Sequence, residues 1–253
     1  MLKKINNKYC IQRVLMLVVS TMGVAYAIYL GISIHNTSKE NLFTRANTIS
    51  QFITTKDVAL LRASEEDLSN PVYVNLKNKF IAIRSVNPDV RFIYLNGMKN
   101  GKVFFYVDSE NIDSPDYSPP GQPYDEASAL MKKLFQKKGN VFEIAGDRWG
   151  LWASALVPIV DKESGKTVAL LGIDVSAKKY ITDILVYCLS ALLFASLVLL
   201  LLIGQKRAIN HIHMAEESLK ANNLEIANLT KIIDEKERKN KKDKGEDFKN
   251  SAH

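Results

Sequence analysis

The chain has few of the residues on which catalysis and metal binding usually depend. It contains two cysteines and four histidines among 253 residues. Cys10 precedes one long apolar run and Cys188 lies inside another, so the region between the runs has no disulfide framework. No Cys/His group has metal-ligand spacing, and no GxSxG, glycine-rich phosphate loop or HExxH motif occurs. The sequence therefore predicts neither an enzyme nor a metal or cofactor site.

Charge is missing from two long segments. Residues 14–34 and 184–203 contain no charged side chain, and each is long enough to cross a hydrocarbon core of about 30 Å as a helix. We predict that both are transmembrane helices. A cleaved signal peptide is the alternative for the first segment, because residues 25–27 (Ala-Tyr-Ala) resemble a cleavage site. The apolar run continues beyond that point, which favours an uncleaved anchor.

Basic residues flank both predicted spans and set their orientation. The positive-inside rule places both termini in the cytoplasm and residues 35–183 outside. Basic residues at the membrane ends and in the tail also explain most of the net charge of +7, so nucleic-acid binding is not expected. The flanking residues are Lys3, Lys4, Lys8 and Arg13 before the first span and Lys206 and Arg207 after the second.

The region between the spans has the pattern of an α+β domain. Its apolar periodicities predict a five-stranded antiparallel sheet with helices on one side. The Asn70-Pro71 pair marks one helix start, Asp125 is a candidate cap for another, and residues 97–101 form a hairpin turn. The predicted strands are 90–96, 102–108, 141–144, 151–160 and 167–175, and the predicted helices are 39–60, 71–86 and 125–138.

The segment after the second span is charged and helical. Apolar residues recur at seven-residue intervals, and Asn222 lies in the facing seam, as in a short coiled coil. We predict a coiled coil over residues 204–233 that forms a parallel homodimer, followed by a disordered, charged tail over residues 234–253. The heptad residues are Ile212, Leu219, Ile226 and Ile233.

A proline-rich loop follows the predicted hairpin. It holds four of the chain's seven prolines together with Asp113, Asp116, Tyr117 and Tyr124. Proline limits the entropy that such a loop loses on ordering. The loop is therefore suited to cover a small-molecule pocket, and a purely structural Ω-loop is the alternative.

Several motifs in this region carry a family resemblance. They read RFIYL, VDSE, DYSPPGQPY, WASALVPI and GIDVS in chain order. Over residues 39–180 the chain resembles the extracytoplasmic PAS-like (PDC, or Cache) sensor domains of bacterial histidine kinases, diguanylate cyclases and chemoreceptors. The resemblance implies a PAS-like sheet, a location in the inner (cytoplasmic) membrane and a small-molecule ligand. Asp174, in GIDVS, matches an Asp that many of these domains direct toward the ligand.

Nine residues are candidates for ligand binding. An arginine would bind a carboxylate, the carboxylates would hold an amine, and aromatic rings would add cation–π contacts. The expected ligand is therefore an amino acid, an amine or a carboxylate. The candidates are Arg91, Tyr94, Tyr106, Asp108, Asp116, Tyr117, Tyr124, Trp152 and Asp174.

Structural roles remain open for some of these residues. Arg91 is as well suited to an ion pair with Asp108 or Glu110 that fixes the hairpin. Asp174 has the alternative role of capping the exit helix. Trp149, in the turn before the fourth strand, is expected to be a packing or rim residue rather than a ligand contact.

No catalytic output domain is recognisable in the chain. His211 and His213 stand in NHIHMAEE, which does not resemble the phospho-acceptor box of histidine kinases, and no GGDEF sequence occurs. Two functions are consistent with this. One is a sensor that relays ligand binding through residues 184–203 and the coiled coil to a cytoplasmic kinase or cyclase partner. The other is a non-sensing membrane tether, or a truncated remnant of a sensor kinase, that acts only as a dimerising scaffold.

Overall fold

The computed structural model describes residues 2–250, with the side chains of residues 11–238. The chain divides into two compact units. Residues 24–192 form one, and the residues up to 23 together with those from 193 onward form the other. The basic residues Lys3, Lys4 and Lys8 of the orientation prediction, and Cys10, lie outside the described side chains.

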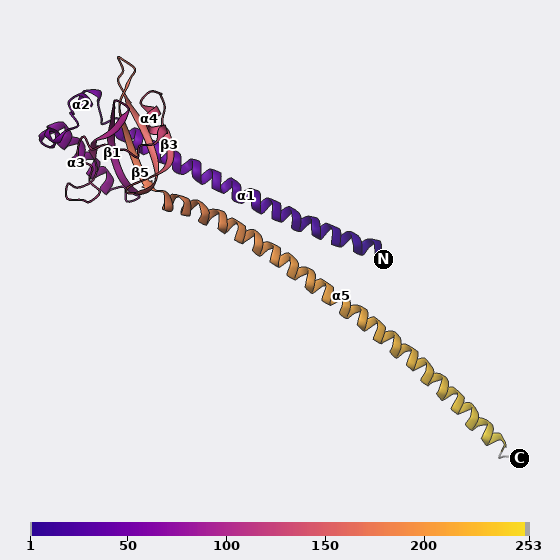
Figure 1. Cartoon of the computed structure of the whole chain (residues 1–253). Coiled ribbons are helices and arrows are strands. Elements are labelled where there is room, and N and C mark those ends of the chain that lie inside the picture. Colours follow the sequence, from indigo (N-terminus) through magenta and orange to yellow (C-terminus); the bar gives the residue numbers. More distant parts are fainter. Residues whose placement is uncertain (1, 251–253) are drawn as a thin grey trace. The chain divides into compact units, whose positions relative to one another are not determined.

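A five-stranded antiparallel sheet forms the centre of the unit 24–192 (Figure 1). The strand order is β2-β1-β5-β4-β3, so the last strand in the sequence is central and pairs with β1 and β4. This confirms the predicted α+β class and its five antiparallel strands. The strands are β1 (Val90–Lys99), β2 (Lys102–Asp108), β3 (Val141–Asp147), β4 (Gly150–Val160) and β5 (Thr167–Ser176).

Different helices cover the two faces of the sheet. Helices α1 (Leu2–Ser50) and α3 (Pro71–Ser85) enclose a large apolar core on one face, whereas α4 (Ala129–Leu134) covers part of the other. Neighbouring residues of a strand point to opposite faces, so Ile93 belongs to the large core and Tyr94 to the second one. The prediction of helices on one side only was therefore wrong.

The helix that leaves the first apolar segment is shorter than predicted. We expected one helix over 39–60, but α1 ends ten residues earlier and a separate helix, α2 (Thr55–Ala59), follows. The second helix begins at a capping box, in which Thr54 and Asp57 each accept a hydrogen bond from the other's backbone N–H. Leu60, the last residue of the predicted helix, is 58% exposed.

Helix α3 begins where the sequence predicted. The Asn70 side chain accepts a hydrogen bond from the backbone N–H of Val72 at 2.9 Å, and Pro71 occupies the first helical position. A 3₁₀ turn, η1 (Glu65–Ser69), precedes it. The buried Asp67 carboxylate ties this turn to the preceding chain by accepting backbone hydrogen bonds there.

Helix α4 starts later than predicted and has a different cap. The hydroxyl of Ser128, not the carboxylate of Asp125, accepts the hydrogen bond from the N–H of Met131. Starting the helix at Ser128 changes its buried face. Met131 is buried, whereas Leu130 is 49% exposed.

The β1–β2 hairpin turns at two residues instead of five. Asn100 and Gly101 both have positive φ angles, 52° and 76°, which a tight two-residue hairpin turn requires. Gly97 lies within β1 and not in the turn, and the rings of Phe104 and Tyr106 cover it. A Cβ at that position would lie 2.3 Å from the Phe104 ring.

Helix α5 (Ala177–Asn250) begins directly after β5. It continues through the predicted coiled-coil region and beyond residue 234, where we predicted a disordered tail. Acidic residues four positions before basic ones, such as Asp234 and Arg238, favour helix in this charged segment. Composition alone, without this spacing, predicts disorder here.

Two helical stretches are long and apolar enough to cross a membrane, one in α1 and one in α5. They contain the predicted spans 14–34 and 184–203. Within the unit 24–192 the two helices touch through small residues. The Cys188 thiol donates a hydrogen bond to the carbonyl of Ala27 at 3.4 Å, and Gly31 leaves room for the Cys188 sulfur.

An aromatic contact joins α1 to α5 where α5 leaves the sheet. The Tyr180 hydroxyl and His35 Nδ1 are hydrogen-bonded at 2.7 Å. Phe142 of β3 packs edge-on against the His35 ring, with centroids 5.7 Å apart. Three elements that are distant in the sequence therefore meet at the first turn of α5.

Candidate functional site

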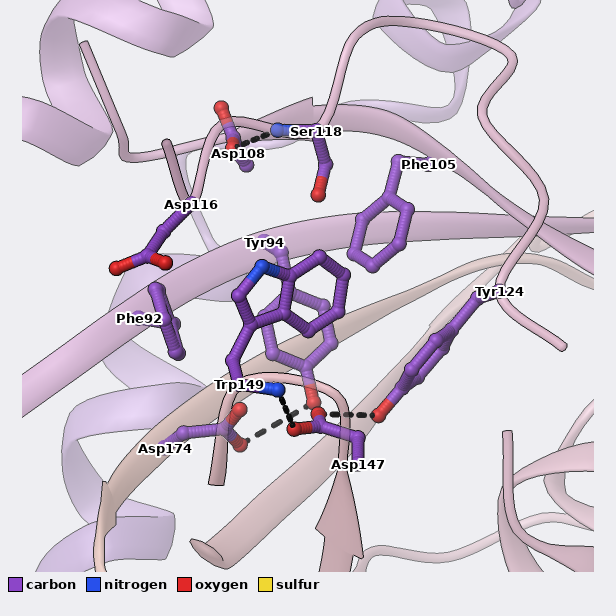
Figure 2. Close-up of a pocket in the computed structure, with 10 residues that line it drawn as sticks. All are labelled: Phe92, Tyr94, Phe105, Asp108, Asp116, Ser118, Tyr124, Asp147, Trp149 and Asp174. Atoms are coloured by element: carbon purple, nitrogen blue, oxygen red, sulfur yellow. Dashed lines mark hydrogen bonds between the residues drawn. The ribbon is translucent and has the colours of Figure 1, made fainter. Parts of the chain in front are cut away.

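A small cavity lies between the second face of the sheet, the proline-rich loop and the β3–β4 turn (Figure 2). Its volume of about 20 Å³ is enough for about one water molecule. Aromatic and acidic side chains dominate its walls. The lining residues are Phe92, Tyr94, Phe105, Asp108, Asp116, Ser118, Tyr124, Asp147, Trp149 and Asp174.

The central strands bring Tyr94 and Asp174 together. Tyr94 lies opposite Gly172 in the pairing of β1 with β5. The missing side chain of Gly172 is essential, because a Cβ there would lie 2.2 Å from the Tyr94 ring. The ring therefore lies flat over β5, and its hydroxyl donates a hydrogen bond to Asp174 Oδ1 at 3.2 Å.

Asp174 is a buried carboxyl group, with 3% of its surface exposed. Burial raises the pKa of Asp174 to about 7, the nearby Asp147 and Glu143 act in the same direction, and hydrogen bonds from Ser154 and Tyr94 oppose the rise. Among the described residues it has no cationic partner. Its charge therefore changes near neutral pH.

Asp147, at the end of β3, is a lining residue that the sequence analysis missed. Its Oδ1 accepts hydrogen bonds from the backbone N–H groups of Trp149 and Gly150 and from the indole N–H of Trp152, at 2.9, 3.0 and 2.9 Å. Its Oδ2 accepts one from the Tyr124 hydroxyl at 2.9 Å. All four donors are neutral. An Asp that opens a tight turn beside two tryptophans was the available sequence signal.

The β3–β4 turn covers the cavity with Trp149. The indole packs near Phe92, Phe105 and Tyr124, with ring centroids 6.2, 5.9 and 6.2 Å away. The adjacent Arg148 forms a two-pronged ion pair with Glu126, at 2.7 and 2.6 Å. This pair joins the turn to the loop before α4. Trp149, expected to be a packing or rim residue, packs against these rings and also lines the cavity.

Arg91 has the ion-pair role that the sequence analysis left open. It forms ion pairs with Glu110 and Asp116, and Arg84 of α3 also pairs with Glu110. Its guanidinium lies over the Phe92 ring, 4.3 Å from the centroid. Arg91 thus holds the proline-rich loop against β1 from outside the cavity.

Asp108 and Tyr117 belong to a second anchor of the same loop. Asp108 accepts hydrogen bonds from Lys77 Nζ at 2.7 Å and from the Ser118 N–H at 2.8 Å. Burial raises the Asp108 pKa, although Lys77 opposes the rise. The ammonium of the buried Lys77 also lies 4.3 Å from the centre of the Tyr117 ring. The Tyr117 hydroxyl is hydrogen-bonded to that of Tyr73.

A β-bulge explains why strand alternation misplaced one residue. Strict alternation puts Tyr106 and Asp108 on one face. In the structure Leu95 pairs with Val107 and Asn96 pairs with Phe105, so Tyr106 is the extra residue. Tyr106 packs against the large core on the opposite face.

Five of the nine candidates line the cavity, namely Tyr94, Asp108, Asp116, Tyr124 and Asp174. Arg91 and Tyr117 anchor the loop, Tyr106 faces the other core, and Trp152 supports Asp147 from behind. A role in ligand binding stays a prediction for all nine. The lining residues absent from the prediction are Phe92, Phe105, Ser118, Asp147 and Trp149.

No protein-family model and no curated protein matches the chain. Solved structures similar to it include the ligand-binding domain of the Campylobacter jejuni chemoreceptor Tlp3 in complex with L-valine, at 15% identity and a TM-score of 0.42, covering 67% of this chain and 66% of that one. The Escherichia coli DcuS sensor domain matches at 16% identity and a TM-score of 0.40, covering 58% of this chain and 98% of that one. The extracellular domain of the putative histidine kinase soHK1S-Z6 matches at 14% identity and a TM-score of 0.43, covering 70% of this chain and 66% of that one.

The chain spans just under two thirds of the Tlp3 domain. At these identities and TM-scores, the similarities assign no function to this chain. Its own strand order, its flanking helices and the two apolar helices that bracket the domain agree with the sequence motifs. The domain is an α+β fold with a five-stranded antiparallel sheet in the order β2-β1-β5-β4-β3, and its resemblance to PAS-like (PDC/Cache) sensor domains rests on the sequence motifs.

Proposed function

We propose that the protein is a membrane-anchored sensor whose extracytoplasmic domain binds a small molecule in the cavity beneath Trp149. In this proposal residues 14–34 and 184–203 cross the inner membrane, residues 35–183 lie outside, and both termini are cytoplasmic. The ligand class expected from the sequence is an amino acid, an amine or a carboxylate. Binding is relayed through α5 to the cytoplasm.

The position of Asp174 carries the proposal. This buried carboxyl lines the cavity and stands on the central strand, which ends at Ser176. Helix α5 begins at the next residue. With no linker between them, a shift of β5 caused by a ligand reaches the helix directly.

The size of the shift in α5 depends on how differently the ligand binds two conformations of the domain. A ligand moves the helix only to the extent that it binds one conformation more tightly than the other. Such coupling typically amounts to about 1–3 kcal/mol. The small volume of the cavity supplies a suitable pair of states, because a ligand larger than water requires the turn at Trp149 to move outward.

The cytoplasmic part of the proposal rests on an exposed apolar stripe. Ile212, Leu219 and Ile226 are each 60% or more exposed at seven-residue spacing, which suits a parallel homodimer. The dimer would present the end of α5 to a kinase or cyclase partner. Single cysteines at Leu219 and Ile226 should cross-link efficiently, and a monomer in the membrane would contradict this part.

The test of sensing uses the full chain in lipid nanodiscs. Trp149 lines the cavity, and Trp152, the chain's other tryptophan, donates a hydrogen bond to the lining residue Asp147, so tryptophan fluorescence should report binding. A panel of amino acids, amines and carboxylates is titrated, and melting temperatures are measured in parallel. We expect at least one compound to change both signals, with tenfold or greater weakening in Asp174→Ala. Glu163→Ala, in an exposed turn, is the matched control.

A dimerising scaffold is the second candidate function. The observation in its favour is the small volume of the cavity. If no compound of any charge class changes fluorescence or melting while α5 still cross-links, the scaffold replaces the sensor.

A further inference from the structure

We infer that the cavity selects a small alkylammonium cation that carries no carboxylate of its own. This inference rests on the proposed sensor function and names the ligand class of the same site. It follows from three features of the lining: its unbalanced charge, the engagement of the neighbouring cations, and its aromatic walls.

The cavity lining contains more carboxyl groups than there are cations paired with them. Four carboxyl groups line the cavity. Lys77 pairs with Asp108, and Arg91 pairs with Asp116. The remaining two, Asp147 and Asp174, have only neutral hydrogen-bond donors among the described residues. Asp174 is buried, and a buried carboxylate without a cation is costly, so a bound cation would complete this site.

The site offers no cation to a ligand carboxylate. The cations around the cavity are Arg91, Lys77 and Arg148. Arg91 is already shared between Glu110 and Asp116, Lys77 is held by Asp108, and Arg148 is paired with Glu126. None of the three lines the cavity. A ligand carboxylate would therefore face acidic side chains, which excludes zwitterions and acids in favour of simple cations.

The remaining wall is aromatic. Phe92, Tyr94, Phe105, Tyr124 and Trp149 line the cavity together, and the Trp149 indole packs near the rings of Phe92, Phe105 and Tyr124 (Figure 2). Rings placed around an ammonium attract it through their negative faces, with tryptophan strongest. Alkyl groups on the nitrogen would in addition be buried against these rings.

Trp149 has to move outward for such a cation to enter, because the cavity holds about one water molecule. The movement is confined to the short turn between β3 and β4. The Arg148–Glu126 pair that holds this turn is about one third exposed on each side and so contributes little. The turn can open while the paired strands stay intact.

The experiment uses the full chain in nanodiscs and follows tryptophan fluorescence and melting temperature. The probes are tetramethylammonium chloride, tert-butanol as a neutral molecule of similar shape, glycine betaine as the same head with a carboxylate, and sodium chloride for ionic strength. Tetramethylammonium should bind and raise the melting temperature. The other three should have no comparable effect.

Variants separate binding from folding. Asp174→Asn and Trp149→Leu should each weaken tetramethylammonium binding at least tenfold, and Glu163→Gln should leave it unchanged. Asn has nearly the shape of the neutral Asp side chain, so the first variant should stay folded. Its melting transition verifies this.

The pH dependence gives an independent measurement. Tyr94 of β1, Tyr124 of the loop, and Glu143 and Asp147 of β3 all act on the charge of Asp174. Because burial raises its pKa to about 7, tetramethylammonium should bind more weakly at pH 5.5 than at pH 8, by up to about tenfold per pH unit below that pKa. Asp174→Asn should remove this dependence.

The outcomes distinguish a failure of the cation inference from a failure of the proposed sensor function. Equal binding of glycine betaine, or binding of tetramethylammonium that Asp174→Asn leaves unchanged, overturns the cation inference. In that case the sensor proposal stands if another member of the wider panel binds. Both fail if no cationic, neutral or anionic compound binds.

Discussion

The two faces of one sheet differ sharply in what they bury. On the face covered by α1 and α3, Ile173 and Leu171 of β5 are fully enclosed by apolar side chains. On the other face the neighbouring Asp174 is equally inaccessible, but its surroundings are carboxyls, hydroxyls and aromatic rings. Adjacent residues of a single strand thus have different roles. The first face supplies stability, and the second retains polar groups that folding alone would not require.

The largest difference between the faces should appear in stability. Ile173→Ala removes a fully buried side chain and leaves a void in the large core, which should cost about 2–5 kcal/mol. Asp174→Asn, one residue away, should cost far less at neutral pH. Urea unfolding of both variants measures the contrast, and equal losses would contradict it.

The cavity face should also make stability depend on pH. The folded pKa of Asp174 is about 7, above its ordinary value of 3.8, so the folded state retains a proton that the unfolded state loses. This contribution is complete below about pH 4 and is lost as pH rises to about 7, on the order of 4 kcal/mol. The measurement is the difference between the stability curves of the wild type and Asp174→Asn, since other groups titrate in both.

Gly172 tests how closely the cavity face is fitted together. In Gly172→Ala the new methyl group would collide with the Tyr94 ring, and overpacking of this kind costs about 1–3 kcal/mol. The ring must move away from Asp174, so the pH-dependent part of the stability should change as well. If Gly172→Ala loses this stability but the dependence of stability on pH is unaltered, the Tyr94–Asp174 contact has no influence on the ionisation of the Asp174 carboxyl. Gly146→Ala, at a strand position where the new methyl group would meet only ordinary van der Waals contacts at 3.6 Å, is the matched control.

The smallest effect should come from the ion pair that holds the turn over the cavity. Glu126→Gln should change stability by about 0–1 kcal/mol, because both partners are partly exposed. Ligand association, measured by stopped-flow tryptophan fluorescence, should nevertheless become faster. A slower association would mean that the pair shapes the entrance instead of closing it.

The fold was largely predictable from the sequence because its signals are local. Alternating apolar residues mark the strands, and Asn70-Pro71 marks the start of α3. Where the prediction failed, a second local signal had competed with the first. Ser128 caps α4 in place of Asp125, and the Thr54–Asp57 capping box starts a new helix where the apolar spacing indicated a continuous one.

The site was predictable only in part because it is built by non-local geometry. The bulge at Tyr106 moves that ring to the other face and brings Asp108 to the side of Phe105. Asp147 and Trp149 reach the cavity only because β3 and β4 fold back at a tight turn. Neither the bulge nor the approach of this turn to the cavity can be recognised from periodicity in the sequence.

The hydrogen bond between Tyr180 and His35 has a mechanical consequence. It joins the first turn of α5 to α1, and the Cys188–Ala27 contact joins the same two helices again eight residues later. In the proposed relay, a push from β5 would therefore tilt α5 together with the adjoining part of α1 instead of displacing α5 alone. From Tyr180 to Leu192 the helix extends about 18 Å, at 1.5 Å per residue, so a tilt of roughly 5° would move Leu192 sideways by about 1.6 Å, comparable to the helix shifts of known switches.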